Sequence, residues 1–114
     1  MILGFNKRFI DPILSGHKIH TLRLDRCNRW KAGNIIHFAV NVRTKRQSQF
    51  EELKCTGTQT IKIEYRGRDP KKYAPHITID GKELDTAGIQ LLARKDGFDK
   101  DFEGKIIHWT HFRY

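Results

Sequence analysis

The stretch that decides the fold is residues 16–23, which read Gly16-His17-Lys18-Ile19-His20-Thr21-Leu22-Arg23. Gly16 follows a short helical pattern, and glycine ends helices readily because it adopts left-handed backbone angles at low cost. The chain then enters a β-rich run that carries Lys18, Thr21 and Arg23. Two cations and a hydroxyl beside a tight turn suit an anionic or polar ligand. The alternative is that they form the solvent-exposed face of an edge strand.

Short strand patterns dominate the rest of the chain. Asp11 and Pro12 predict the start of a brief helix that Gly16 ends, and a second helix of about ten residues opens at Asp85 or Thr86. Strands are expected at residues 1–5, 17–24, 35–42, 54–65, 76–79 and 105–112. Many short strands with two or three short helices predict one α+β, β-rich domain over residues 1–114, built as a small mixed β-barrel.

The apolar positions of these strands alternate with period two, which places them on one face of each strand. In a chain of 114 residues such faces have room for one hydrophobic core. We therefore expect a single core that holds most of Ile36, Phe38, Val40, Ile61, Ile63, Leu91, Leu92 and Trp109.

The chain is strongly basic, with 22 Lys and Arg against 13 Asp and Glu and a formal net charge of +9. Such a surface attracts polyanions, of which nucleic acid is the commonest in a cell. Two polar loops concentrate the cations, and one of them adds an aromatic ring on which a base can stack. The predicted nucleic-acid contacts in these loops are Arg43, Lys45, Arg46, Arg66, Arg68, Lys71, Lys72 and Tyr73. The alternative is that the loops are merely solvated.

Several other classes of protein are not indicated. No apolar run approaches the ~20 residues of a membrane span and no signal peptide is visible, so we expect a cytoplasmic protein without a membrane partner. The two cysteines are too few for a disulfide scaffold. His17 and His20 are three residues apart in a predicted strand, as are His108 and His111, so each pair points to opposite faces. We expect no metal, no cofactor and a monomer.

Two blocks of the sequence resemble ASCH domains, whose fold is PUA-like. The first runs from Phe5 to Arg23, with a phenylalanine-rich lead, a helix ending in Gly and the pattern Gly-x-Lys-x-x-Thr-x-Arg. The second is Ala93-Arg94-Lys95-Asp96-Gly97-Phe98, followed by Phe102 and Trp109. Together they cover roughly a third of the chain. The resemblance implies a PUA-like fold with a cleft at residues 16–23 that binds RNA or a nucleoside base.

Small members of the ASCH family hydrolyse N4-acetylcytidine with a threonine nucleophile beside a lysine and a glutamate. The resemblance maps the lysine onto Lys18 and the threonine onto Thr21. The glutamate falls on Glu83, with Asp85 as the alternative acid. In a flat strand Lys18 and Thr21 would face opposite sides, so the pair works only if Lys18 belongs to the turn after Gly16.

Two classes of function follow. The first is a non-catalytic RNA-binding module, in which Lys18 and Arg23 contact phosphate and the basic loops extend the contact surface. The second is an amidohydrolase that cleaves N4-acetylcytidine or a similar acylated nucleoside with Lys18, Thr21 and Glu83. The net charge favours the first and the intact Lys-x-x-Thr favours the second. We expect the RNA-binding module.

Overall fold

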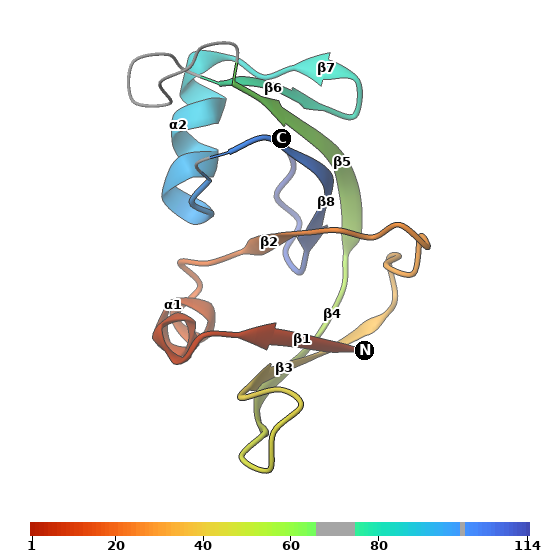
Figure 1. Cartoon of the computed structure of the whole chain (residues 1–114), viewed down its shortest axis with the longest axis vertical. Helices are drawn as coiled ribbons and strands as arrows, with labels where there is room; N and C mark the ends of the chain where they lie inside the picture. Colours follow the sequence, from red (N-terminus) through yellow and green to blue (C-terminus); the bar gives the residue numbers. More distant parts are fainter. Residues whose placement is uncertain (66–74, 99) are drawn as a thin grey trace.

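Strands make up most of the regular structure in the computed structural model, which describes residues 1–65, 75–98 and 100–114 (Figure 1). In chain order the elements are β1 (Ile2–Phe5), the 3₁₀ helix η1 (Lys7–Phe9), α1 (Ile10–Ser15), β2 (His20–Arg23), β3 (Ile35–Val40), β4 (Ser48–Lys54), β5 (Gly57–Glu64), β6 (His76–Ile79), β7 (Lys82–Glu83), α2 (Thr86–Lys95) and β8 (Phe102–His108). This confirms a small, strand-rich α+β protein. Within the described residues it has two α-helices.

The strands form two hydrogen-bonded sheets. The first has the order β1-β3-β4, with β1 parallel to β3 and β3 antiparallel to β4. The second has the order β2-β8-β5-β6-β7 and is antiparallel throughout. Figure 1 shows the first sheet and α1 in the lower part of the molecule, and the second sheet with α2 in the upper part. The pairings of the described strands close neither sheet, so the expected barrel is not shown.

Strand β8 separates two hydrophobic clusters, because its neighbours Ile106 and Ile107 point to opposite faces of the sheet. The cluster on the Ile107 face is Leu3, Phe5, Ile13, Trp30, Ile36, Phe38, Cys55, Ile107 and Trp109. The cluster on the Ile106 face is Ile61, Ile63, Ile77, Ile79, Leu92 and Ile106, and it includes the buried residue of α2. The prediction of a single core is therefore wrong, since Phe38 and Trp109 lie in one cluster and Ile61 and Leu92 in the other.

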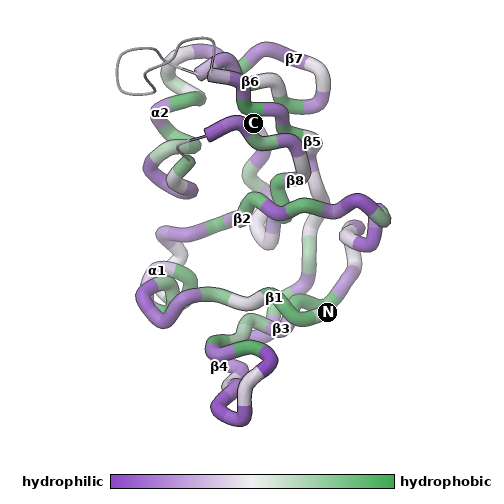
Figure 2. Tube along the Cα trace, viewed as in Figure 1, coloured by the Kyte–Doolittle hydropathy of each residue, from purple (hydrophilic) through white to green (hydrophobic). Residues whose placement is uncertain are grey.

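The expected strand over residues 54–65 is divided between the two sheets. Cys55 donates its backbone N–H to the carbonyl of Asn34, just before β3, whereas Thr56 donates to the carbonyl of His108, at the end of β8. The chain thus changes sheets between these two residues, and a continuous strand pattern could not show that change. Figure 2 shows that the loop between β3 and β4, at the end of the molecule away from α2, is largely hydrophilic.

Candidate functional site

A pocket of about 350 Å³ lies where β1, η1, β2 and the C-terminal end of α2 meet. We call it the Lys18 pocket. Its lining residues are Gly4, Phe5, Asn6, Arg8, Phe9, Lys18, Thr21, Leu22, Arg23, Lys95, Asp96 and Gly97. Four of them are cations and one is a carboxylate. The pocket therefore brings Lys18, Thr21 and Arg23 together, three of the residues that the sequence marks as functional.

The end of α1 places Lys18 outside the strand. Gly16 adopts φ 85°, in the left-handed region, and its N–H donates to the carbonyl of Ile13. The backbone N–H of Lys18 donates to the carbonyl of Pro12 at 3.0 Å, so the turn folds back onto the helix. Strand β2 begins only at His20. Lys18 and Thr21 can therefore line the same pocket, which a flat strand over residues 17–24 would not allow.

Asp96 is the acid that contacts Lys18. It is the C-cap residue of α2, and it is only 9% exposed. One carboxylate oxygen forms an ion pair with the ammonium of Lys18, which also donates to the carbonyl of Lys95 at 3.4 Å. The other oxygen accepts from Nδ1 of His20, whose side chain is fully buried. Both oxygens of this carboxylate are therefore engaged inside the protein.

The polar chain continues from His20 to Tyr114. Because a carboxylate only accepts hydrogen bonds, Nδ1 of His20 is the donor toward Asp96, and in the neutral form of the ring Nε2 accepts from the Tyr114 hydroxyl at 2.7 Å. Burial and the nearby charge of Asp96 raise the pKa of Tyr114, which keeps this phenol protonated and able to donate. The result is a continuous buried network that links Lys18, Asp96, His20 and Tyr114.

A second buried histidine lies beside this network, with its ring 5.3 Å from that of His20. The amide nitrogen of Gln59 donates to Asp80 and to the Tyr114 carbonyl, so the amide oxygen of Gln59 faces Nε2 of His108 at 3.0 Å. Nε2 therefore carries the proton, and Nδ1 has no hydrogen-bond partner among the described residues. Burial first, and then the charges of His20 in its protonated form and of Arg113, lower the pKa of His108 to about 3.

Thr21 and Arg23 form the opposite side of the site. Nε of Arg23 donates to the Thr21 hydroxyl at 3.4 Å, and Nη2 donates to the carbonyl of Gly4 at 2.7 Å. The guanidinium lies over the ring of Phe5, 5.0 Å from its centroid. Burial lowers the pKa of Arg23, and the charge of Asp96 partly offsets that effect. Among the described residues, no side chain that could act as a base contacts the Thr21 hydroxyl.

The two acids expected to complete a catalytic site lie elsewhere. The Glu83 side chain, in β7, is 72% exposed and pairs with Nδ1 of His76 at 3.0 Å. Asp85 caps α2 by accepting from the N–H of Gly88 at 2.7 Å. Neither lines the Lys18 pocket. The acid that does line the pocket, Asp96, was not predicted as a site residue. It lies at the end of a predicted helix, in the second block that resembles ASCH domains, and that block is the one sequence signal that could have identified Asp96.

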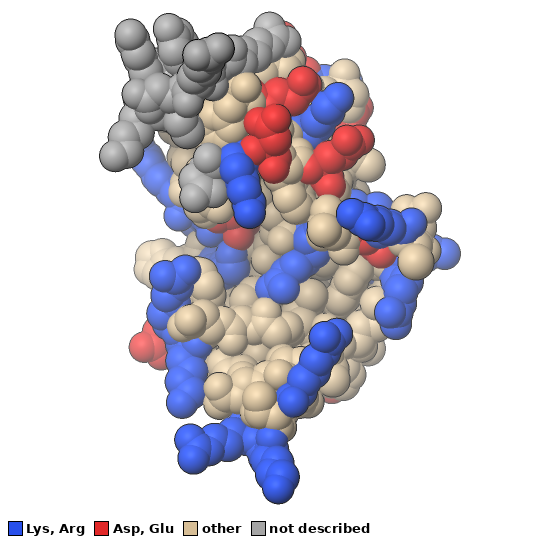
Figure 3. Space-filling model, in the orientation of Figure 1, with Lys and Arg blue, Asp and Glu red and all other residues tan. Residues whose placement is uncertain are grey.

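Of the basic loops, only the one between β3 and β4 lies in the described part of the chain. Arg43, Lys45 and Arg46 are all exposed there. The predicted contacts Arg66, Arg68, Lys71, Lys72 and Tyr73 lie outside the described residues. Figure 3 shows Lys and Arg side chains spread over the lower part of the visible face, and acidic side chains gathered toward the top. The sequence has the same asymmetry, with 11 Lys and Arg against 4 Asp and Glu in residues 1–56, and 11 against 9 in residues 57–114.

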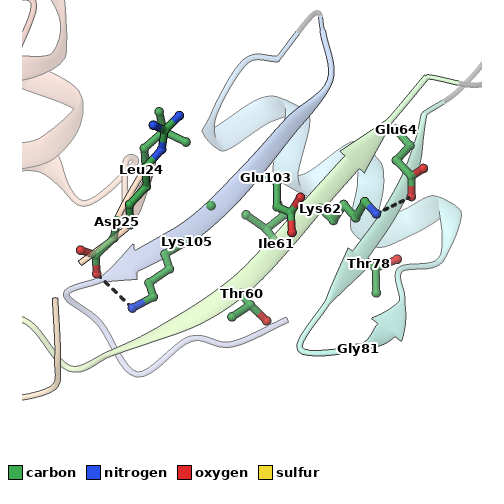
Figure 4. A pocket seen from close by; sticks show the side chains of 12 residues that line it. Leu24, Asp25, Thr60, Ile61, Lys62, Glu64, Thr78, Gly81, Glu103 and Lys105 are labelled. Atoms are coloured by element: carbon green, nitrogen blue, oxygen red, sulfur yellow. Dashed lines mark hydrogen bonds and ion pairs between the residues drawn. The ribbon is translucent and has the colours of Figure 1, made fainter. Parts of the chain in front are cut away.

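A larger pocket, of about 690 Å³, lies on the face of the five-stranded sheet (Figure 4). Three cations and three carboxylates line it. Lys105 pairs with Asp25 at 3.0 Å and Lys62 pairs with Glu64 at 3.8 Å, as the dashed lines in Figure 4 mark. None of the described residues that line this surface is aromatic. Balanced, mostly paired charges without a stacking ring make it a weaker ligand site than the Lys18 pocket.

The described residues offer neither a metal site nor a membrane-spanning helix. They contain no group of three or more His, Cys, Asp or Glu side chains placed to hold a metal ion. No helix in the same part of the chain is long and apolar enough to span a membrane.

Comparison with known proteins gives no relative: no family model matches the chain, and neither a curated protein nor a solved structure matches it significantly.

Proposed function

We propose that the protein is a non-catalytic RNA-binding module that holds RNA or a nucleoside base in the Lys18 pocket. The observation that carries this proposal is the composition of the pocket, whose described lining residues include four cations, the aromatic Phe9 and a single carboxylate. Cations along a backbone and a ring beneath a base are the combination that grips single-stranded nucleic acid. The +9 net charge provides long-range attraction for the same partner.

The resemblance to ASCH domains supports this proposal, because it concerns the same residues. Lys18, Thr21 and Arg23 belong to the ASCH-like pattern, and Asp96 belongs to the second block. A PUA-like barrel, action as a monomer and a cytoplasmic location are parts of the same proposal.

Binding of a short single-stranded RNA, followed by fluorescence anisotropy, tests the proposal. Arg8 is exposed, Lys95 is half-buried, and both line the pocket, so Arg8→Gln with Lys95→Gln should weaken binding by about 1 kcal/mol for each lost contact. The control is Lys62→Gln with Lys82→Gln, which removes the same charge from exposed positions outside the pocket. Equal losses in the two double variants would show that the pocket is not the binding site.

A second candidate function is hydrolysis of N4-acetylcytidine or a similar acylated nucleoside, because Lys18, Thr21 and a carboxylate line one pocket. In this reaction the Thr21 oxygen attacks the acetyl carbon, the C–N bond breaks, and cytidine leaves as the free amine after gaining a proton. Water then releases acetate from the acyl-threonine. Lys18 is an ammonium donor bound to Asp96, so it would stabilise developing negative charge rather than take the Thr21 proton.

Incubation with N4-acetylcytidine separates the two functions. The binding module should release no cytidine or acetate beyond the rate without protein. Release that disappears in Thr21→Ala would establish the hydrolase instead, since no other hydroxyl of the Gly-x-Lys-x-x-Thr-x-Arg pattern can replace that nucleophile. Glu83→Gln is the matched control, because the Glu83 carboxylate lies outside the pocket.

A further inference from the structure

Among the described residues, the cations that line the Lys18 pocket outnumber the carboxylates. Asp96 is the single carboxylate among the described residues that line it, and Lys18 and His20 occupy its two oxygens. The ammonium of Lys95 lies against the carbonyl of His17 at 2.8 Å. Asp96 therefore neutralises Lys18, and Arg23 keeps its charge without an ion-pair partner among the described residues.

Arg23 still has capacity for a ligand. A guanidinium carries five N–H groups, and the contacts of Arg23 are the neutral oxygens of Thr21 and Gly4. The remaining N–H groups include both of those on Nη1. Arg23 is half-buried, and an unpaired charge removed from water is unfavourable. An anionic group that paired with this guanidinium would offset that cost.

The walls of the pocket show where such an anion would lie. One wall is the C-terminal end of α2, where the carbonyl of Lys95 and the carboxylate of Asp96 lie, and these negative groups disfavour an anion on that side. The other wall is β1 and η1, where Arg23 contacts Gly4 and Phe5. Arg8 lies over the ring of Phe9 on that same side. The favourable place for an anion is therefore between Arg23 and the β1–η1 wall.

We propose that Arg23 binds a phosphate group, so that the ligand of the Lys18 pocket is a nucleotide, free or as a unit of RNA, rather than an unphosphorylated nucleoside. This inference rests on the proposed function, which places a base in the same pocket. The planar fork of a guanidinium matches two oxygens of a phosphate. Phe9 is partly exposed and lines the same pocket, with Arg8 and Lys18 over its ring, and it is the aromatic side chain that would contact the base.

Calorimetric titration with cytidine and with cytidine 5′-monophosphate at low salt tests the inference. In the native protein the nucleotide should bind at least about tenfold more tightly than the nucleoside, as one charge-assisted contact allows. Arg23→Gln should reduce that ratio to nearly one. Arg26→Gln removes the same charge from an exposed residue outside the Lys18 pocket and should leave the ratio unchanged.

The possible outcomes separate a failure of the phosphate contact from a failure of the proposed function. Equal affinities of the native protein for both ligands would overturn the phosphate contact and leave base binding intact. A ratio that survives in Arg23→Gln would also overturn it. If neither ligand nor single-stranded RNA binds, the proposed function itself fails. If Arg23→Gln does not fold, competition with inorganic phosphate in the native protein provides the test. Phosphate should displace the nucleotide and leave cytidine bound. Any other pattern counts against the inference.

Discussion

The ammonium of Lys18 forms an ion pair with the carboxylate of Asp96, although the two residues are 78 positions apart in the chain. Lys18 follows the end of α1, and Asp96 is the C-cap of α2. Both side chains are at least nine-tenths buried. The pair therefore fixes the turn before β2 against the end of α2, and it sets the distance between two walls of the pocket.

Removal of the carboxylate should be strongly destabilising. In Asp96→Asn the buried ammonium of Lys18 loses its counter-ion, and His20 loses its charged acceptor. Breaking one side of a buried ion pair typically costs about 3 kcal/mol or more. We expect a decrease of this size in the free energy of unfolding, measured with urea.

The matched control for that substitution is Glu83→Gln, which also converts a carboxylate to its amide. Glu83 is exposed and pairs with His76 at the surface, so the free energy of unfolding should change by less than about 0.5 kcal/mol. Similar losses in the two variants would contradict the assignment of Asp96 as the buried acid of this site.

The two buried histidines should differ in tautomer. At pH 8 we expect His20 to carry its proton on Nδ1, which donates to Asp96, and His108 to carry its proton on Nε2, which faces the Gln59 oxygen. Tyr114→Phe removes the donor to Nε2 of His20, and should shift that nitrogen resonance while the His108 resonances change little. Nitrogen-15 NMR of the imidazoles measures both effects. The same tautomer at both residues would refute this hydrogen-bond assignment.

Local sequence signals predicted local structure well. The period-two pattern placed a strand at residues 35–42, and β3 spans Ile35–Val40. Gly16 ends α1, as its conformational freedom predicts. The helix expected from Asp85 or Thr86 is α2, with Asp85 as its N-cap. Each of these features depends on interactions between residues that are close in the chain.

The parts that the sequence could not predict depend on distant contacts. Nothing near Asp96 in the sequence shows that its partner is Lys18, and the family resemblance placed the acid at the exposed Glu83 instead. The sequence pattern correctly places the apolar neighbours Ile106 and Ile107 in one strand. It does not show that they pack in different hydrophobic clusters, because both faces of β8 are covered. Periodicity identifies the faces of a strand, and only the packed structure shows what covers each one.

Stability should depend on pH through His108. Its pKa is lowered from 6.5 to about 3 in the folded protein. Below about pH 6.5 the unfolded chain binds a proton at this histidine that the folded chain does not. The free energy of unfolding therefore falls by about 1.4 kcal/mol for each pH unit between about pH 6.5 and about pH 3. Above pH 6.5 the effect vanishes.

The substitution His108→Phe should remove this dependence, because a phenyl ring fills the site without titrating. Its free energy of unfolding, relative to that of the native protein, should therefore rise as pH falls from about 7.5 to about 4.5. Urea unfolding at several pH values measures the difference, and His111→Phe, at an exposed position, is the control for loss of one imidazole. A difference that stays constant with pH would show that His108 does not remain neutral in the fold.

RNA binding should weaken steeply with salt, because each phosphate contacted by a cation releases condensed counter-ions. For single strands the slope of log K against log salt changes by about 0.7 for each contact. We expect Arg43→Gln, Lys45→Gln and Arg46→Gln together to flatten the slope, since these exposed side chains belong to the more basic half of the chain.

A second variant neutralises Arg66, Arg68, Lys71 and Lys72 and should do the same. The control neutralises three exposed lysines of the less basic half, Lys62, Lys82 and Lys100. Anisotropy titrations over a range of salt concentrations give the slopes. If the control flattens the slope as much as the loop variants, the attraction is a property of the net charge and not of the basic loops.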